Sequence, residues 1–403
     1  MSQGRSLASL NLNSNLLELN EAATVALADR VRSLQASGRK IFALQTGDPD
    51  FPTPAPIVEA AHRAMQEGQT HYANSRGLLD LREAVARKLL RTNAAEYDPA
   101  KEILITSGGV HAYYCGLLAI LNPGDEVLVP DPSWMTHVNL VSLAGGRAVR
   151  VPTRPEENFL PTISGWERML SPRTVALVLN SPSNPTGAVA SREYLGELNE
   201  FAARRKLYVI SDEVYESILY DGREHTCFAS LPRAKERCLV INSFSKTYAM
   251  TGWRIGYLAA PEQVVSQALK ASQHTITNVA PFTQKAAITA LSDPAVAAAV
   301  KEMTVAYARR KRAVMQMWRE SRGPIKLFEP QGAFYFFIDV RGLNRPSSEI
   351  AESLLNETGV ALVPGSVYGT NGEGFLRMTI AAADETIAAG FGSFLGWASA
   401  RFK

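Results

Sequence analysis

The chain has 403 residues, of which 46% are hydrophobic and 20% are charged, a composition typical of a globular protein with two or three domains. A formal net charge of only +3, with 28 glycines and 22 prolines, excludes a strongly basic nucleic-acid-binding protein and a collagen-like or low-complexity chain. Three widely spaced cysteines, and no apolar run near the ~18 residues of a membrane span, argue against a disulfide framework, a thiolate metal site and a membrane protein. We therefore expect a cytoplasmic protein that binds neither nucleic acid nor a membrane, and we predict no metal site.

The first part of the chain combines a helical pattern with an extended segment. Apolar residues have helical spacing over 16–34, IFALQ (41–45) is typical of a strand, and TGDPDFPTP (46–54) is rich in turn-forming residues. We expect residues 1–45 to join the far end of the chain in one domain.

The middle of the chain alternates short β-branched runs with helical patterns. Helices are predicted over 112–121 and 193–206. Strands are predicted over 103–106, 148–152 and 174–180, and in NPGDEVLVP, YVISDEVY, CLVINSFS and IGYLAA. This alternation indicates a mostly parallel sheet covered on both faces, with ligands bound at the carboxyl ends of the strands.

The last part predicts a long helix over about 293–322, followed by two strands in FYFFIDV and FLRMTIA and by further helices. We predict a large domain of residues 46–292 and a small α+β domain made of residues 1–45 and 293–403, with the long helix as connector.

Two of the predicted strands are followed by turns with unusual polar residues. Ser107-Gly108-Gly109-Val110 starts a helix, where free N–H groups and glycine favour an anion, although a structural turn is the alternative. The turn is not GxGxxG, so a dinucleotide is not expected. Ser181-Pro182-Ser183-Asn184-Pro185-Thr186-Gly187 forms a rigid loop in which the bond after Asn184 is a candidate for the cis form.

Two further strand ends carry charged residues. Asp212 ends a buried strand and needs a partner, which a cationic ring nitrogen would supply; capping of the next helix is the alternative. Lys246 lies in SFSKT, where burial would favour its neutral, nucleophilic amine. Arg254 follows eight residues later with a planar fork suited to phosphate.

Taken together and in order, these residues resemble the pyridoxal-phosphate site of the class I/II aminotransferases of fold type I, especially their bacterial aspartate-aminotransferase-like branch. The resemblance runs from TGDPDF through HYANSRGLLDLREAVA, NPGDEVLVPDPSW, SPSNPTGAV, SDEVYE, SFSKTYAMTGWRIGY and GAFYFF to FLRMTIA. It implies an α/β fold with a mostly parallel seven-stranded sheet in the large domain. It also implies a homodimer that uses pyridoxal 5'-phosphate to move an amino group between an L-amino acid and a 2-oxo acid by a ping-pong mechanism.

The resemblance assigns catalytic roles to Lys246, Asp212 and Tyr215. Lys246 would bind the cofactor aldehyde and later move the substrate proton as general base and acid. Asp212 would hold the ring nitrogen protonated, Tyr215 and Asn184 would bind the phenolate oxygen, and Trp134 would stack on the ring.

The resemblance also implies two anion-binding groups. The cofactor phosphate would be bound by Gly109, Val110, Ser243, Ser245 and Arg254, with Tyr72 reaching it from a partner subunit. The substrate α-carboxylate would be bound by Arg377, Gly47 and Asn184.

One position departs from the aspartate-preferring relatives, which often have a lysine directly after the glycine pair. Val110 stands there in this chain. We therefore expect a substrate that is not strictly dicarboxylic, with His111, Tyr113 and His274 as candidates to line its side-chain pocket, although packing also explains each of them. A non-transaminating enzyme on the same scaffold, such as a lyase, a synthase or an amino-acid oxidase, stays open as the alternative. A non-catalytic sensor module is disfavoured because Lys246 is present.

Overall fold

The computed structural model describes residues 14–17, 19, 21, 23–321 and 323–401. Its centre is a seven-stranded sheet in which every strand is parallel to its neighbours except β8, which pairs antiparallel with both β2 and β7. Across the sheet the strands are β2 (Ile103–Thr106), β8 (Gly256–Ala259), β7 (Cys238–Ser243), β6 (Tyr208–Asp212), β5 (Thr174–Asn180), β3 (Glu126–Asp131) and β4 (Arg147–Pro152). The predicted mostly parallel sheet is confirmed.

Helices cover both faces of this sheet because alternate strand residues point to opposite sides. Leu104 packs in one core and Ile103 and Ile105 pack in the other. The Leu104 core is covered by α5 (Gly108–Ile120), α6 (Met135–Leu143) and α9 (Glu262–Thr275). The opposite core is covered by α3 (Ala55–Gln66), α4 (Leu79–Asn93), α7 (Ile163–Arg168), α8 (Arg192–Arg205) and α10 (Pro281–Ser292).

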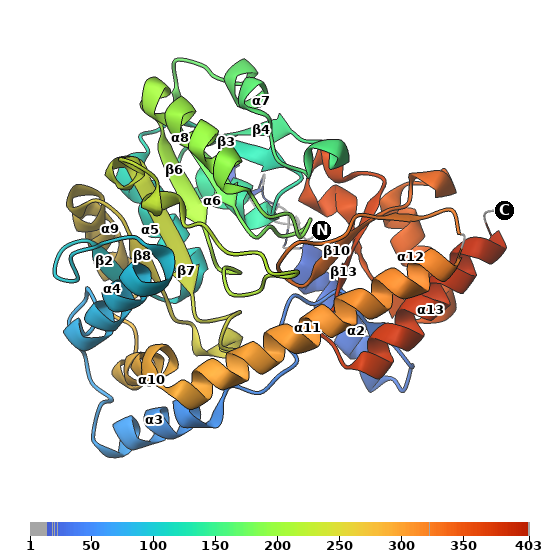
Figure 1. Cartoon of the computed structure of the whole chain (residues 1–403), viewed down its shortest axis with the longest axis horizontal. Coiled ribbons are helices and arrows are strands. Elements are labelled where there is room, and N and C mark those ends of the chain that lie inside the picture. Colours follow the sequence, from blue (N-terminus) through green and yellow to red (C-terminus); the bar gives the residue numbers. More distant parts are fainter. Residues whose placement is uncertain (1–13, 18, 20, 22, 322, 402–403) are drawn as a thin grey trace, which may run out of the picture.

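Both chain ends contribute to a second group of elements, shown on the right of Figure 1. The antiparallel sheet has the order β12 (Val363–Pro364), β13 (Phe375–Thr379), β10 (Tyr335–Asp339) and β9 (Lys326–Leu327). Next to it β1 (Phe42–Ala43) pairs in parallel with β11 (Val360–Ala361), so the two ends of the chain meet. The surrounding helices are α2 (Ala23–Ala36), α12 (Ser347–Thr358) and α13 (Asp384–Arg401), whereas α1 (Ser14–Leu17) contacts α6 beside the large sheet.

The long helix α11 (Pro294–Ser321) runs from α10, beside the large sheet, to α13, beside the small one (Figure 1). It confirms the helix predicted over about 293–322 in all but its ends, and Arg322 lies outside the described residues. The division into a large domain of residues 46–292 and a small domain of residues 1–45 and 293–403 stays a prediction.

One predicted element is wrong in part. A single helix was expected over 16–34, but Leu19 lies in a bend and Glu21 is not helical, so α1 and α2 are separate. Apolar spacing specifies which face of a segment is buried, but it does not mark where the backbone turns. Among the described residues, no helix is both long and apolar enough to cross a membrane.

Candidate active site

A cavity of about 420 Å³ opens at the carboxyl ends of β5, β6 and β7, where Asn180, Asp212 and Ser243 are the last residues of their strands. This volume is within the range of about 300–1,000 Å³ for small-molecule sites. All residues predicted to bind the cofactor or the α-carboxylate line it except Tyr72: Gly47, Gly109, Val110, Trp134, Asn184, Asp212, Tyr215, Ser243, Ser245, Lys246, Arg254 and Arg377.

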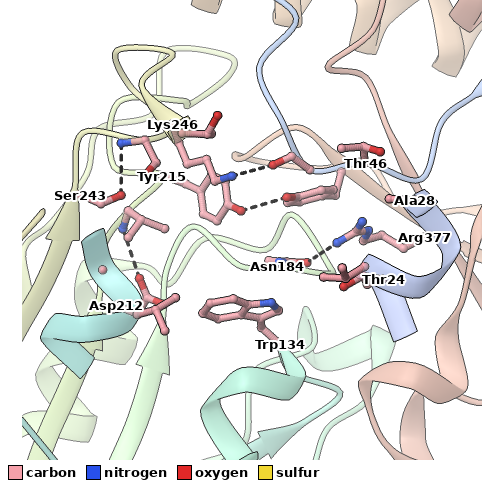
Figure 2. A pocket seen from close by; sticks show the side chains of 18 of the residues that line it. Thr24, Ala28, Thr46, Trp134, Asn184, Asp212, Tyr215, Ser243, Lys246 and Arg377 are labelled. Atoms are coloured by element: carbon pink, nitrogen blue, oxygen red, sulfur yellow. Dashed lines mark hydrogen bonds between the residues drawn. The ribbon is translucent and has the colours of Figure 1, made fainter. Parts of the chain in front are cut away.

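The amine of Lys246 lies inside this cavity. Its Nζ donates a 2.6 Å hydrogen bond to the carbonyl oxygen of Gly47 (Figure 2). Burial lowers the pKa of Lys246 to about 8, helped by the positive charges of Arg377 and Arg254 and opposed by the carboxylate of Asp48. About a tenth of the amine is therefore uncharged at pH 7 and about half at pH 8, and the uncharged form is the one that a nucleophile or a general base requires.

Asp212 is almost fully buried at the end of β6. The Nε2 atom of His137 lies 2.9 Å from its Oδ2, and the backbone N–H of Val214 donates to its Oδ1 at 3.4 Å. Trp134 packs edge-on against His137, with ring centroids 5.3 Å apart. These contacts fix the orientation of the Asp212 carboxylate. Its oxygen atoms can still accept a further hydrogen bond from a ligand.

An anion-binding corner forms where the start of α5 meets β7 and β8. Thr106 and Ser243 both pair with Gly256, and a Cβ on Gly256 would lie 2.9 Å from the backbone nitrogen of Gly109. Only glycine allows this close approach, which brings the free N–H groups at the start of α5 beside Ser243.

Arg254 completes this corner. A Cβ on Gly108 would lie 2.6 Å from its Nη2, so the guanidinium covers the glycine turn. Its Nη1 donates to the carbonyl oxygen of Thr251 at 2.8 Å, and within the described part of the chain no carboxylate pairs with it. The helix dipole and this unpaired cation together favour a phosphate group.

The second anion-binding position is Arg377 on β13, which is only 3% exposed. Its Nη1 donates to Asn184 Oδ1 at 3.1 Å and its Nη2 donates to the Gln45 carbonyl oxygen, while its Nε has no partner among the described residues. Its guanidinium also lies over the ring of Tyr335, 4.5 Å from the centroid. A buried arginine with a free donor and no carboxylate partner is suited to a ligand carboxylate.

Tyr215 and Tyr335 form a buried pair whose hydroxyl oxygens are 2.9 Å apart (Figure 2). Burial raises the pKa of Tyr215 well above its usual range, so its hydroxyl stays protonated and can donate. Gly47 lies against the pair, because a Cβ there would be 2.1 Å from the Tyr335 hydroxyl oxygen.

Several residues of the site were assigned no role from the sequence. Thr46 and Tyr335 lie within the TGDPDF and GAFYFF motifs, but neither was singled out. Gln45 and the α2 residues that line the cavity, and His137 behind Asp212, lie in no motif. His111, Tyr113 and His274, the candidates for the side-chain pocket, are not among the described residues that line this cavity. His111 instead bonds Thr275, and Tyr113 bonds the carbonyl oxygen of His137.

Tyr72 lies apart from the cavity and is 88% exposed. It lines a separate surface hollow with Ile276 and Phe282, among others. Within this chain it cannot be placed at the phosphate corner.

A polar cluster behind Asp212 consists of Glu213, Glu216 and His225, whose ligand-type atoms all lie within 4.8 Å of one another. Protein groups already bind its carboxylates, because His225 and Ser211 contact Glu213 and Lys88 contacts Glu216. The cluster is therefore a satisfied ion-pair network.

The residues present fit pyridoxal phosphate. In Figure 2, Ser243 and Arg377 lie on opposite sides of the cavity, with Lys246 between them and Asp212 and Trp134 below. This cofactor and an amino acid together require four kinds of group, and the cavity has each of them. They are an anion-binding corner, an amine for an aldehyde, a carboxylate for a ring nitrogen and a free arginine Nε for a carboxylate.

Comparison with known proteins agrees with this chemistry. The family model for aminotransferase class I and II matches residues 39–389. An aspartate aminotransferase of Pyrococcus abyssi is 42% identical over 353 residues, covering 87% of this chain and 90% of that protein. An aromatic-amino-acid aminotransferase of Thermococcus litoralis is 40% identical, covering 90% of this chain and 96% of that protein.

Solved structures give the same result. The aspartate aminotransferase of Thermus thermophilus, determined with maleate, superposes with a TM-score of 0.92 at 37% identity, covering 96% of this chain and 99% of that one. The comparisons do not favour a lyase, synthase or oxidase. This chain therefore belongs to the class I and II aminotransferases, and it is a pyridoxal-phosphate-dependent enzyme of fold type I that acts on amino acids and 2-oxo acids.

Proposed function

We propose that Lys246, Asp212 and Tyr215 carry out transamination in this cavity. The observation that carries the proposal is the position of the Lys246 amine between the Ser243–Arg254 corner and Arg377. A molecule bound to both anion-binding positions would have its centre beside this amine, and such positioning supplies much of the rate enhancement of an enzyme.

Asp212 and Trp134 would hold the cofactor ring. When bound, pyridoxal phosphate supplies an electron sink that stabilises negative charge at the substrate α-carbon. The carboxylate of Asp212, oriented by His137, would keep the ring nitrogen protonated, and Tyr215 and Asn184 would donate to the phenolate oxygen. Trp134 would cover one face of the ring.

The phosphate would be bound by the N–H groups of Gly109 and Val110, by the hydroxyls of Ser243 and Ser245, and by Arg254. The glycine contacts around Gly256 and the unpaired guanidinium support this assignment. We propose that Tyr72 of the partner subunit adds its hydroxyl, in a homodimer with shared sites. The high exposure of Tyr72 in one chain supports this part.

Arg377 would bind the substrate α-carboxylate, with Asn184 and the backbone of Gly47 beside it. Its partnerless Nε supports this role. With the carboxylate held there, the Nζ of Lys246 would remove the proton from the α-carbon as a general base and return it as a general acid. The lowered pKa of Lys246 suits both directions near neutral pH.

The substrate range is proposed to include amino acids without an acidic side chain. Val110 stands at the edge of the cavity, where it offers an apolar surface and no charge. The two relatives named for aspartate and for aromatic amino acids show that the family supports both kinds of substrate. We also propose a cytoplasmic location, which the three free, buried cysteines support.

Single half-reactions test the proposed function. Purified holoenzyme mixed with each of the twenty amino acids is expected to convert its cofactor stoichiometrically to the pyridoxamine form with at least one of them. Borohydride treatment should fix the cofactor to Lys246, as peptide mapping would show. Turnover without pyridoxamine formation, or a label on another residue, would contradict the proposal.

The dimer is tested separately. Sedimentation should give a dimer, and Tyr72→Phe should weaken phosphate-dependent cofactor binding without dissociating it. Tyr208→Phe, a change on β6 outside the cavity lining, is the control.

A further inference from the structure

One basic residue of the cavity has no role in the proposed function. The described lining contains four basic residues, Lys246, Arg254, Arg377 and Arg32. The first three are assigned to the cofactor aldehyde, the phosphate and the α-carboxylate. Arg32, from α2, is the surplus cation.

Helix α2 directs one face toward the cavity. Thr24, Ala28 and Arg32 all line it, and their spacing of four residues places them on one side of a helix. Figure 2 shows Thr24 and Ala28 on the Arg377 side of the cavity. Arg32 therefore belongs to the side where a substrate lies, away from the phosphate corner.

The backbone of α2 is anchored, while the Arg32 side chain is not. Arg30 makes two hydrogen bonds of 2.6 and 2.7 Å to Glu352 of α12, which hold α2 on the small sheet's helices. Arg32 itself is 68% exposed and pairs with Asp29, three residues earlier on the same helix. Exposed pairs of this kind contribute little, so a ligand carboxylate can replace Asp29 as partner.

Apart from Arg377, which is assigned to the α-carboxylate, the described lining offers no second basic residue on this side. Among the described residues that line the cavity, the one acidic side chain is Asp212, which already has His137 as partner. Val110, directly after the glycine pair, also lines the cavity and carries no charge.

We propose that Arg32 binds the distal carboxylate of dicarboxylic substrates, and that it pairs with Asp29 when the substrate side chain is uncharged. This inference rests on the proposed function. A ping-pong transaminase must accept its donor and its acceptor in the same cavity, and an arginine with two alternative partners allows one substrate to be acidic and the other apolar.

The test compares two amino acids of equal chain length, glutamate and norvaline, which differ in the distal carboxylate. In single half-reactions, Arg32→Met should lower kcat/KM for glutamate about tenfold or more and keep that for norvaline within about twofold. Arg87→Met is the matched control. Like Arg32, Arg87 is exposed (67%) and pairs with an acidic residue of its own helix, in this case Glu83 of α4. Arg87→Met should change neither value.

A binding measurement separates this inference from the proposed function. Calorimetry with succinate and butanoate, which need no turnover, should show that Arg32→Met weakens succinate binding alone. An equal loss for glutamate and norvaline, or no loss of succinate affinity, would overturn the role of Arg32. A third outcome is that succinate binding depends on Arg32 but no amino acid gives a half-reaction. That outcome would overturn the proposed transamination and would support the role of Arg32 in binding a carboxylate.

Discussion

The Nε2 atom of His137 lies 2.9 Å from the Oδ2 atom of Asp212, and both side chains are almost fully buried. The two residues are 75 positions apart in the sequence. His137 is on α6, directly after the turn that carries Trp134, while Asp212 ends β6. The contact fixes the orientation of the Asp212 carboxylate. That carboxylate would accept a hydrogen bond from a protonated ring nitrogen.

Replacing His137 by Phe is expected to lower kcat about tenfold and to weaken cofactor binding, because Asp212 loses a buried hydrogen bond worth about 1–3 kcal/mol. Because His137 acts through Asp212, the absorption spectrum of the bound cofactor should change as well, which a purely structural defect would not cause. His137→Asn, which keeps a donor, should recover part of both effects. The exposed His274→Phe is the control. An unaltered spectrum in His137→Phe would contradict the positioning role.

Gly47 is expected not to tolerate alanine. Its added Cβ would lie 2.1 Å from the Tyr335 hydroxyl oxygen and would disturb the Tyr215–Tyr335 pair, at a cost of about 1–3 kcal/mol in stability. Urea denaturation and half-reaction kinetics measure the two consequences.

The double variant Gly47→Ala with Tyr335→Phe supplies the decisive comparison, since it removes the clashing oxygen. It should be more stable than Gly47→Ala alone. Gly196→Ala in α8 is the control, because no heavy atom lies within 4 Å of a Cβ at that position. If Gly47→Ala behaves like Gly196→Ala, the close contact with Tyr335 does not constrain the site.

Arg377→Lys should reduce kcat/KM for every amino acid by a similar factor of about 100, since it removes the fork that binds a carboxylate with two donors. Cofactor affinity should change little. Arg341→Lys is the control, because Arg341 is exposed, pairs with Asp339 and does not line the cavity. A loss confined to acidic substrates would show that Arg377 binds the side chain instead of the α-carboxylate.

The cofactor-free enzyme should be stabilised by Lys246→Met at pH 7, because the wild type then buries a protonated amine. Burial lowers the pKa of Lys246 to about 8 in the folded chain, against about 10.5 in an unfolded one. Between these values the unfolded state holds more protons, so wild-type stability should rise relative to the variant by up to about 1.4 kcal/mol per pH unit. Below pH 8 the difference should be constant.

Urea denaturation of both cofactor-free proteins at pH 7, 8, 9 and 10 checks this prediction. Taking the difference between them removes the titration of all other groups. Parallel pH profiles would mean that the Lys246 pKa is not lowered in the fold.

Much of the large sheet was predictable because its strands are continuous apolar runs. The strands predicted over 103–106 and 174–180 have these bounds in the structure. The helix predicted over 193–206 is Arg192–Arg205, where Ser191 accepts a hydrogen bond from the Tyr194 N–H. Where the pattern is weaker, as over 16–34, the prediction merged two helices into one.

The sequence by itself determined that several polar residues gather at one edge of the large sheet, because they end or follow strands and parallel strands bring their carboxyl ends to one edge. Asp212, Ser243 and Lys246 therefore lie together, as their order along the chain predicts. The tertiary structure alone decided the partners of these residues. Arg377 meets Asn184 across 193 positions and Gln45 across 332. Arg32 reaches the cavity from α2, and His137 reaches Asp212 from α6, although neither lies in a motif. Local spacing specifies the elements and their faces, but contacts between distant elements arise only when those faces pack.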